Sequence, residues 1–368
     1  MAAAAAVMIA ADSGAAASAL PPSGRALQAR SQRNLVFGVV AFDPKTGCGA
    51  ACLRDNYGES VRRWAHSVRR HTDAAQTDVA IFTGAGRGSI THGDAALASA
   101  LRAANVRTIE GDFRDNAQRV AHGDASRYVW CVVRNRWSVI RDYLQAHASA
   151  YRSVLMSDVR DAVVQADPFA WRPRGPAAAG VDFEVDFRSA GWHQRAVVFS
   201  GEGSGSVRTL RASKKGAPRT LQCARDASAA QRAMLLDTDP LNAGVTLGGA
   251  AAFLNFSTAL AALVARVSTT QCLSVKDCTD QGLYNLLVYA HWGAYLPHTT
   301  RVVLPIERAL SYTLGHKKRH VAVDAAGRVR NAHGELPPVV HQFAKGAAGK
   351  ALTRAPAFGE RLRGLLLS

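Results

Sequence analysis

The first half of the chain alternates strand-length apolar runs with amphipathic helical segments, and this alternation constrains the fold most. Mainly apolar runs at 34–42, 78–83 and 153–157 have the length of strands that are buried on both faces. Residues 57–71 and 95–104, which lie between them, carry apolar side chains at helical spacing. Strand–helix repeats of this kind favour a parallel sheet covered by helices. We therefore predict an α/β fold with a Rossmann-like, mostly parallel sheet and flanking helices.

The second half of the chain has shorter strand-like segments than the first. Short strand-like pieces at 181–187 and 196–200 predict a smaller mixed sheet. Helical patterns follow at 250–267 and 280–291, and the residues after 346 are basic with a helical pattern. We expect this half to complete the same fold as the first.

The charge of the chain bears on its partners. Its 368 residues carry a formal net charge of +17, which favours anionic ligands. The arginines are spread from Arg25 to Arg363, however, and no recognised nucleic-acid-binding motif accompanies them. We therefore predict no nucleic-acid partner, and we expect the positive field to favour a substrate such as a nucleotide diphosphate.

The beginning of the chain leaves its destination open. The first twenty residues are rich in alanine and end in Ala17-Ser18-Ala19, which resembles a cleavage site, but no basic residue precedes the short apolar stretch. A signal peptide, a transit peptide and an unstructured start all fit residues 1–33. No run reaches the roughly 20 apolar residues of a membrane span, so membrane contact would come only through this leader.

Four of the six cysteines stand in two close pairs. Cys48 and Cys52 flank a short turn, and Cys272 and Cys278 flank a short loop. No pair has zinc-binding spacing. Local disulfides in an oxidising lumen and buried free thiols both fit, and we favour the disulfide for the second pair.

Acidic residues follow the apolar run at 153–157 directly. Asp158 comes at its end, Asp161 three residues later, and Asp167-Pro168 soon after. Ligands of open α/β sheets bind at the carboxyl ends of strands. Carboxylates on a turn that a sheet holds rigid can bind a hard divalent cation. We therefore expect the chemistry of the chain at this strand end, with Asp158 and Asp161 as candidate ligands of such a cation.

This stretch, Asp158-Val-Arg-Asp161 followed by Asp167-Pro-Phe169, resembles the metal-binding strand end of GT-A-fold glycosyltransferases, which use nucleotide-diphospho-sugars. It is particularly similar to a plant and algal group with D-V-R-D, D-P-F and H-Q-[YF]-D-R motifs. The resemblance covers residues 34–346. It implies a nucleotide-binding half at 34–169 and an acceptor half at 170–346, followed by a basic tail at 347–368.

Two downstream segments extend the resemblance. Asn242-Ala-Gly244 resembles the family's N-x-G strand, which lines the cleft for the donor sugar and the acceptor. Asp280-Gln281 resembles its D-Q-x-x-x-N helix start, which implies catalytic positions near the reacting sugar carbon. An acidic residue at a helix start is also simply a good cap.

The third segment, His341-Gln-Phe-Ala344-Lys345, resembles the H-Q-[YF]-D-R element. The resemblance implies that His341 completes the metal shell and that Lys345 contacts a phosphate. Ala344 stands where the family has Asp; if that Asp orients the histidine, its loss weakens metal binding.

Several arginines are candidates for contact with the donor. Arg160 lies between the two acids and faces either the donor or an acid. Arg136 and Arg141 precede the acidic strand end by helix-scale distances, where family members place a donor-binding basic residue; we choose Arg141. A solvated helix face is an equal alternative for both.

Taken together, the resemblance implies a glycosyltransferase that depends on Mn²⁺ or Mg²⁺. It would move a sugar from a nucleoside-diphosphate sugar to a hydroxyl of a glycan or glycoprotein. The implied location is the secretory pathway, in the Golgi lumen, with the chloroplast as an alternative. A catalytically silent relative that binds glycans or nucleotide sugars is the second hypothesis.

Overall fold

The structure is a computed structural model, in which residues 32–368 form one compact unit. The residues that it describes are 32–40, 57–84, 90, 94–111, 125–172, 196–201, 209–212, 216–225, 227–267, 280–314, 321–343, 352 and 355–367.

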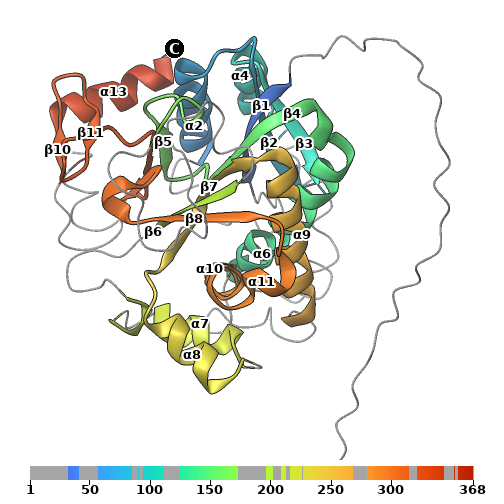
Figure 1. The fold of residues 1–368 in the computed structure, drawn as a ribbon. Coiled ribbons are helices and arrows are strands. Elements are labelled where there is room, and N and C mark those ends of the chain that lie inside the picture. Colours follow the sequence, from blue (N-terminus) through green and yellow to red (C-terminus); the bar gives the residue numbers. More distant parts are fainter. Residues whose placement is uncertain are drawn as a thin grey trace, which may run out of the picture. The chain divides into compact units, whose positions relative to one another are not determined.

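A seven-stranded sheet forms the centre of this unit (Figure 1). Its strands are β1 (Arg33–Val40), β2 (Thr77–Gly84), β3 (Val106–Gly111), β4 (Tyr151–Ser157), β6 (Ala196–Gly201), β7 (Leu241–Gly249) and β8 (Thr300–Leu304). They are ordered β3-β2-β1-β4-β7-β6-β8. The first four run parallel, and β6 and β8 are also parallel to each other. Only β7 is antiparallel to both its neighbours. The prediction of an α/β fold with a mostly parallel sheet is therefore confirmed.

One sequence-based assignment within this sheet is wrong. Residues 196–200 were expected in the smaller sheet, but they form β6 between β7 and β8 of the central one. All six residues of β6 are buried, as expected of a strand covered on both faces. Residues 181–187 lie outside the described part of the chain.

Helices cover the sheet on both faces. They are α2 (Tyr57–His71), α4 (Ala95–Ala103), α6 (Ala125–His147), α7 (Gly216–Cys223), α8 (Ala229–Leu236), α9 (Ala250–Val267), α10 (Asp280–Leu286), α11 (Trp292–Tyr295) and α13 (Pro356–Leu367). A π-helical turn, Leu287–His291, joins α10 to α11. Helices α2 and α4 lie on one face, and α6, α9 and α10 on the other (Figure 1).

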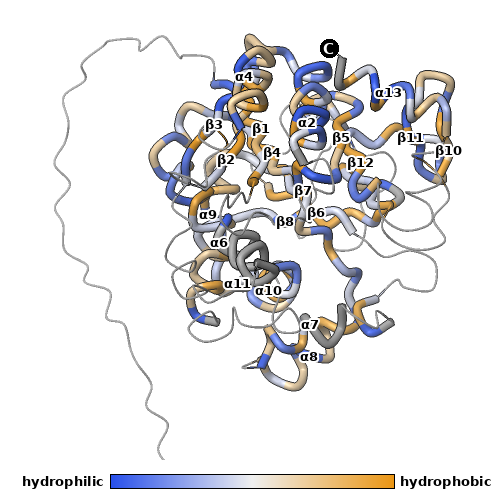
Figure 2. Tube along the Cα trace, turned by 180° about the vertical axis from the view of Figure 1, so that it is seen from behind, coloured by the Kyte–Doolittle hydropathy of each residue, from blue (hydrophilic) through white to orange (hydrophobic). Residues whose placement is uncertain are grey.

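Alternate side chains of β1 explain why both layers are needed. Leu35 and Phe37 pack into the core that contains Trp137 of α6, whereas Val36 packs into the core that contains Trp64 of α2. A strand whose side chains are apolar in both directions is stable only between two layers of helices. Figure 2 shows hydrophobic and hydrophilic residues alternating along α2 and α4, as expected of helices that pack on a sheet by one face.

An aromatic cluster fixes the helices of the second face. Phe256 of α9 makes edge contacts with Trp137 of α6, Phe199 of β6 and Tyr284 of α10. Such pairs contribute about 0.5–1.5 kcal/mol each beyond the area they bury. The cluster holds α6 and α10 together, and these two helices carry Arg136 and Asp280.

Two smaller sheets lie beside the central one. A mixed three-stranded sheet has the order β5-β12-β9, formed by β5 (Ala162–Val164), β12 (Val339–His341) and β9 (Ser311–Thr313). The expected smaller mixed sheet is thus present, but from other residues than those predicted. A hairpin joins β10 (Ala322–Val323) to β11 (Val329–Arg330), and α13 packs against α2. Among the described residues, no helix has the length and apolar character needed to cross a bilayer.

Candidate metal centre

The antiparallel strand β7 brings two separate motifs together. β4 ends at Ser157, and its partner β7 runs in the opposite direction, so that Ser157 pairs with Val245. The start of β7 therefore lies beside the end of β4, where Asp158 N donates to Gly244 O at 2.7 Å. The acidic turn and the Asn242–Gly244 segment thus meet at one edge of the sheet.

The small sheet adds the third motif. β12 pairs antiparallel with β5, and His341 lies opposite Ala162, the residue after Asp161. Gln342 N donates to Asp161 O at 2.6 Å, and Gln342 adopts a left-handed φ of 55° as the chain turns away. This pairing places the imidazole of His341 beside both carboxylates.

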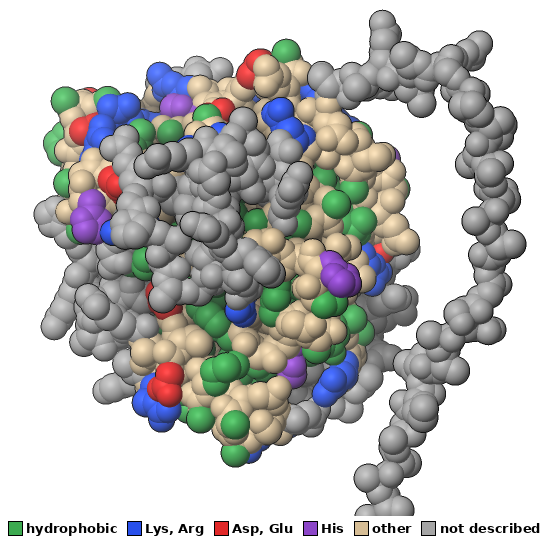
Figure 3. Space-filling view, in the orientation of Figure 1, with side chains coloured by type: hydrophobic (Ala, Val, Ile, Leu, Met, Phe, Trp, Pro, Cys, Tyr) green, Lys and Arg blue, Asp and Glu red, His purple; other side chains and the backbone are tan. Residues whose placement is uncertain are grey.

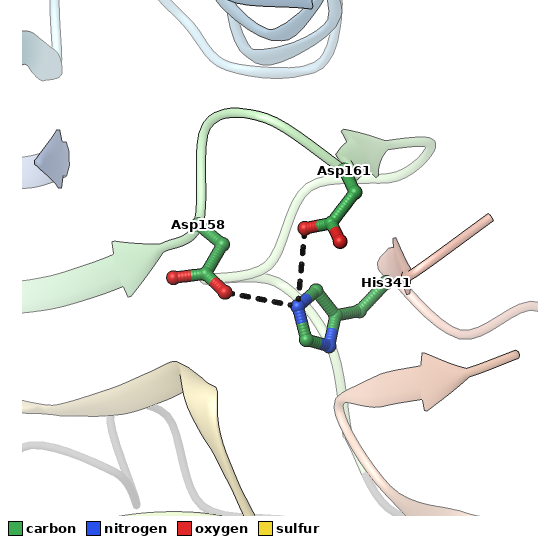
Figure 4. Close-up of side chains that lie close together, drawn as sticks. All are labelled: Asp158, Asp161 and His341. Carbon is green, nitrogen blue, oxygen red and sulfur yellow. Dashed lines mark hydrogen bonds and ion pairs between the residues drawn. The ribbon is translucent and has the colours of Figure 1, made fainter. Parts of the chain in front are cut away.

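Asp158, Asp161 and His341 form a compact cluster (Figure 4). Nε2 of His341 lies 3.1 Å from Asp158 Oδ2 and 3.5 Å from Asp161 Oδ1. The three potential ligand atoms all lie within 4.8 Å of one another. Asp161 and His341 are buried, whereas Asp158 keeps 35% of its side chain exposed. The cluster therefore has a rigid inner side and one ligand at the surface.

The imidazole ring is also held from its other side. Nδ1 of His341 lies 2.7 Å from Nδ2 of Asn242, which donates to Thr313 Oγ1 at 2.6 Å. The backbone N–H of Gly244 donates to Oδ1 of Asn242 at 2.7 Å, which fixes the amide. Residues that position a metal-binding histidine in this way commonly set metal affinity. Asn242 therefore acts on the cluster through His341.

The cluster perturbs the protonation of its members. Burial lowers the pKa of His341, but hydrogen bonds to Asp158 and Asp161 and their charges outweigh it and raise this pKa to about 9. Burial raises the pKa of Asp158, but the His341 hydrogen bond and the charge of Arg136 lower it overall. In the metal-free chain a proton on Nε2 thus lies between the two carboxylates. A cation would take the place of that proton.

A buried arginine links the cluster to α10. Arg136 donates to Asp158 Oδ1 at 3.0 Å, to Asp280 Oδ2 at 2.8 Å and to Ala243 O at 2.7 Å. Only 5% of Arg136 is exposed. Its fixed guanidinium plane suits a bridge between two carboxylates. Asp280, at the start of α10, is thereby tied to Asp158 of the acidic turn.

Gly244 keeps the space beside the ligand atoms open. A Cβ at this position would lie 2.5 Å from Asp158 Oδ2 and 2.7 Å from His341 Nε2. Any larger residue would fill the cradle between them. Two carboxylates and an imidazole are a donor set that suits Mn²⁺, and carboxylates also suit Mg²⁺. The residues present therefore fit a divalent cation.

Asp280 and Gln281 begin α10 beside this cluster, and both are tied to β7 or to Arg136. Gln281 Nε2 donates to Leu241 O at 2.9 Å, while Asn285 Oδ1 accepts from Leu241 N at 3.0 Å. These bonds fasten the first turn of α10 to the start of β7. The expected proximity of the two motifs is present in the structure, while their catalytic roles stay predictions.

Of the other predicted residues, Arg141 lies apart from the cluster and Arg160 lies on its acidic turn. Arg141 is further along α6 and pairs with the exposed carboxylate of Asp142. Arg160 is exposed on the turn between the two acids. Lys345, Ala344 and the four paired cysteines lie outside the described residues, so the predictions about them stay untested.

The sequence reasoning considered Arg136 and Arg141 together and chose Arg141, whereas the structure brings Arg136 to the acids. Arg136 adjoins the buried Trp137 and Arg141 adjoins the buried Ile140, so apolar neighbours in the sequence do not distinguish the two arginines. Thr313 was not found, because nothing in its sequence surroundings marks it.

Comparisons with known proteins give distant structural likenesses. No family model matches the chain, and no curated protein matches it. Among solved structures it is similar to an active-site mutant of LgtC, with 15% identity and a TM-score of 0.45 over 90% of this chain and 94% of that one. It is also similar to galactosyltransferase LgtC in complex with donor and acceptor sugar analogues, with 14% identity and a TM-score of 0.43 over 90% of this chain and 95% of that one. Likenesses this distant identify no family or activity.

Proposed function

We propose that the chain is a metal-dependent glycosyltransferase of the GT-A type. It would move a sugar from a nucleoside-diphosphate sugar to a hydroxyl of a glycan or glycoprotein. One observation carries the proposal: Asp158, Asp161 and His341, assigned as ligands from separate motifs, converge with their ligand atoms within 4.8 Å. His341 stands 183 residues from Asp158, so proximity along the chain does not explain the meeting.

The chemistry of the cluster supports this reaction. A nucleoside diphosphate leaves a sugar only when its growing negative charge is offset, and a cation bound by these three residues would supply that offset. Arg160, exposed beside the cluster, and Lys345 are the side chains that we propose for contact with the diphosphate. Asp158 presents its exposed edge to solvent, which leaves a side from which a phosphate can approach.

The ion pairs of Arg136 with Asp158 and Asp280 support a binding site for the donor sugar next to the diphosphate. They join the acidic turn to Asp280, so the first turn of α10 borders the same space as the metal ligands. We propose that Asp280 and Gln281 lie near the reacting sugar carbon, and that Asn242 and Gly244 shape the floor of the pocket. The 2.8 Å ion pair with Arg136 would keep the carboxylate of Asp280 at this position.

A silent binder of nucleotide sugars is the second candidate, since Ala344 replaces an acid that the family carries. Asn242 contacts Nδ1 of His341 and is itself held by Thr313 and Gly244, so the imidazole has one positioning contact that does not involve residue 344.

Release of nucleoside diphosphate from a panel of nucleotide sugars tests the proposal, with Mn²⁺ and with a chelator. We expect metal-dependent release from one donor, lost in Asp161→Asn and kept in Asp142→Asn, a matched change at an exposed acid of α6. No release, with thermal stabilisation by donor plus metal, would favour the silent binder. If the chain shows no release and no thermal stabilisation with any donor, both candidates are refuted.

A further inference from the structure

Basic side chains from three elements meet on the α2–α13 side of the molecule, and we name them the basic cluster. They are Arg70 and His71 at the end of α2, Arg328 before β11, and Arg361 of α13. Figure 3 shows Lys and Arg side chains gathered over the region where β10, β11 and α13 lie in Figure 1. None of these residues belongs to the candidate metal centre.

Tight backbone packing fixes the geometry of the basic cluster. Gly327, in the β10–β11 turn, has a φ of 69°, and a Cβ there would lie 2.3 Å from Ala357 O of α13. The turn and the helix are therefore in direct contact. Nη2 of Arg361 lies 3.0 Å from Nε2 of His71, which joins α13 to the end of α2. The arginines are thus held near one another by the fold.

The nearest negative charge is already shared. Asp324 accepts from Arg328 Nε at 2.9 Å and from Arg330 Nη2 at 3.0 Å. Among the described residues, Asp324 is the one carboxylate recorded as acting on Arg361. Arg328 of the basic cluster therefore shares its carboxylate partner with Arg330.

The titration of the cluster reflects this excess of positive charge. Burial and then the charges of Arg361, Arg70 and Arg328 lower the pKa of His71 to about 4. Burial and then Arg70 and Arg328 also lower the pKa of Arg361. The dipole at the end of α2 favours Arg70 and His71 there, but it does not account for arginines from two other elements.

We propose that the basic cluster is an anion site that binds a phosphate or sulfate group, separate from the metal centre. Guanidinium groups from different elements can share the oxygens of one tetrahedral anion, and such charge-assisted bonds are strong. The site lies away from the acids: Trp64 of α2 contacts Ser157 beside them, and His71 is about 10 Å further along the helix. A free anion and a sulfated or phosphorylated glycan chain offer the same group.

Binding is tested on the full chain with two probes at constant ionic strength. Inorganic sulfate, compared with chloride, reports on a free anion through the melting temperature. A heparin-derived sulfated oligosaccharide reports on an anionic glycan through direct titration. The variants are Arg361→Gln and Arg70→Gln, the second at an exposed side chain whose loss leaves the packing intact. Arg211→Gln, at an exposed arginine paired with Asp237, is the control for charge.

We expect affinity for at least one probe to fall about tenfold in each cluster variant and to stay unchanged in the control. A response to sulfate assigns a free anion, and a response to the oligosaccharide alone assigns a glycan chain. Equal losses in Arg361→Gln, Arg70→Gln and Arg211→Gln would mean that only net charge matters, and would overturn the proposal. So would binding of neither probe by the unaltered chain.

Discussion

Replacing Gly244 by alanine tests whether the space beside the ligand atoms holds a cation. The backbone of Gly244 is not left-handed, since the positive-φ glycines among the described residues are Gly327 and Gly334. An alanine therefore brings no backbone strain of its own. Its effect comes from one methyl group placed between Asp158 and His341.

The displacement can be estimated from the structure. The new Cβ would lie 2.5 Å from Asp158 Oδ2, whereas ordinary contact begins at 3.4 Å, so the oxygen must retreat by about 0.9 Å (3.4 − 2.5). Metal–ligand distances tolerate about 0.2 Å. Changes around metal ligands commonly cost 10–100-fold in affinity. Because this change acts on two ligands directly, we expect a loss of about 100-fold, or roughly 2.7 kcal/mol.

Calorimetric titration with Mn²⁺ measures this loss, with circular dichroism as a check that the variant folds. Gly293→Ala is the matched control, because a Cβ at Gly293 would meet nothing within 4 Å. That variant should bind Mn²⁺ as the unaltered chain does. Unchanged Mn²⁺ affinity in a folded Gly244→Ala variant would refute the placement of the metal.

Three further predictions follow from the same contacts. Arg136→Met removes the partner of two carboxylates and should lower the free energy of unfolding by about 3–5 kcal/mol in urea titrations, whereas the exposed Arg141→Met should change it little. Asn242→Ala should weaken Mn²⁺ binding about 10–100-fold with little change in fold, because the ring of His341 is no longer held; equal affinity would contradict that role. His71 has a pKa of about 4 when folded and about 6.5 when unfolded, so its contribution is complete above pH 6.5 and is lost as the pH falls toward 4. Since His71 is partly exposed, we expect the drop in the free energy of unfolding between pH 7 and pH 4 to be about 1–2 kcal/mol smaller in His71→Gln than in the unaltered chain. Equal drops in the two proteins would contradict this prediction.

The local pattern of the chain predicts much of the fold, because burial on two faces leaves a direct trace in the sequence. Residues 57–71 show one apolar stripe and form α2 with those bounds. Residues 34–40 of the predicted run at 34–42 form most of β1, and residues 41 and 42 lie outside the described part of the chain. The position of 196–200 was wrong because a short buried run does not reveal which sheet it joins. That choice depends on partners far along the chain.

The two acids of the candidate metal centre could be predicted for a similar reason, since Asp158 and Asp161 follow a recognisable strand, whereas His341 was predicted only from the family resemblance. The partners that hold them were harder to find. Thr313 reaches Asn242 only because β9 lies beside β12, and Arg136 reaches Asp280 only because aromatic packing joins α6 to α10. Such contacts arise from tertiary packing, and the sequence near each residue carries no sign of them.

The most direct test of the central claim is Mn²⁺ binding measured by electron paramagnetic resonance, with and without a panel of nucleoside diphosphates. The account predicts one Mn²⁺ per chain, bound more tightly in the presence of one diphosphate. It also predicts that Asp161→Asn abolishes this binding and that Asp142→Asn leaves it unchanged. Mn²⁺ binding that survives in Asp161→Asn, or that no diphosphate strengthens, would contradict it.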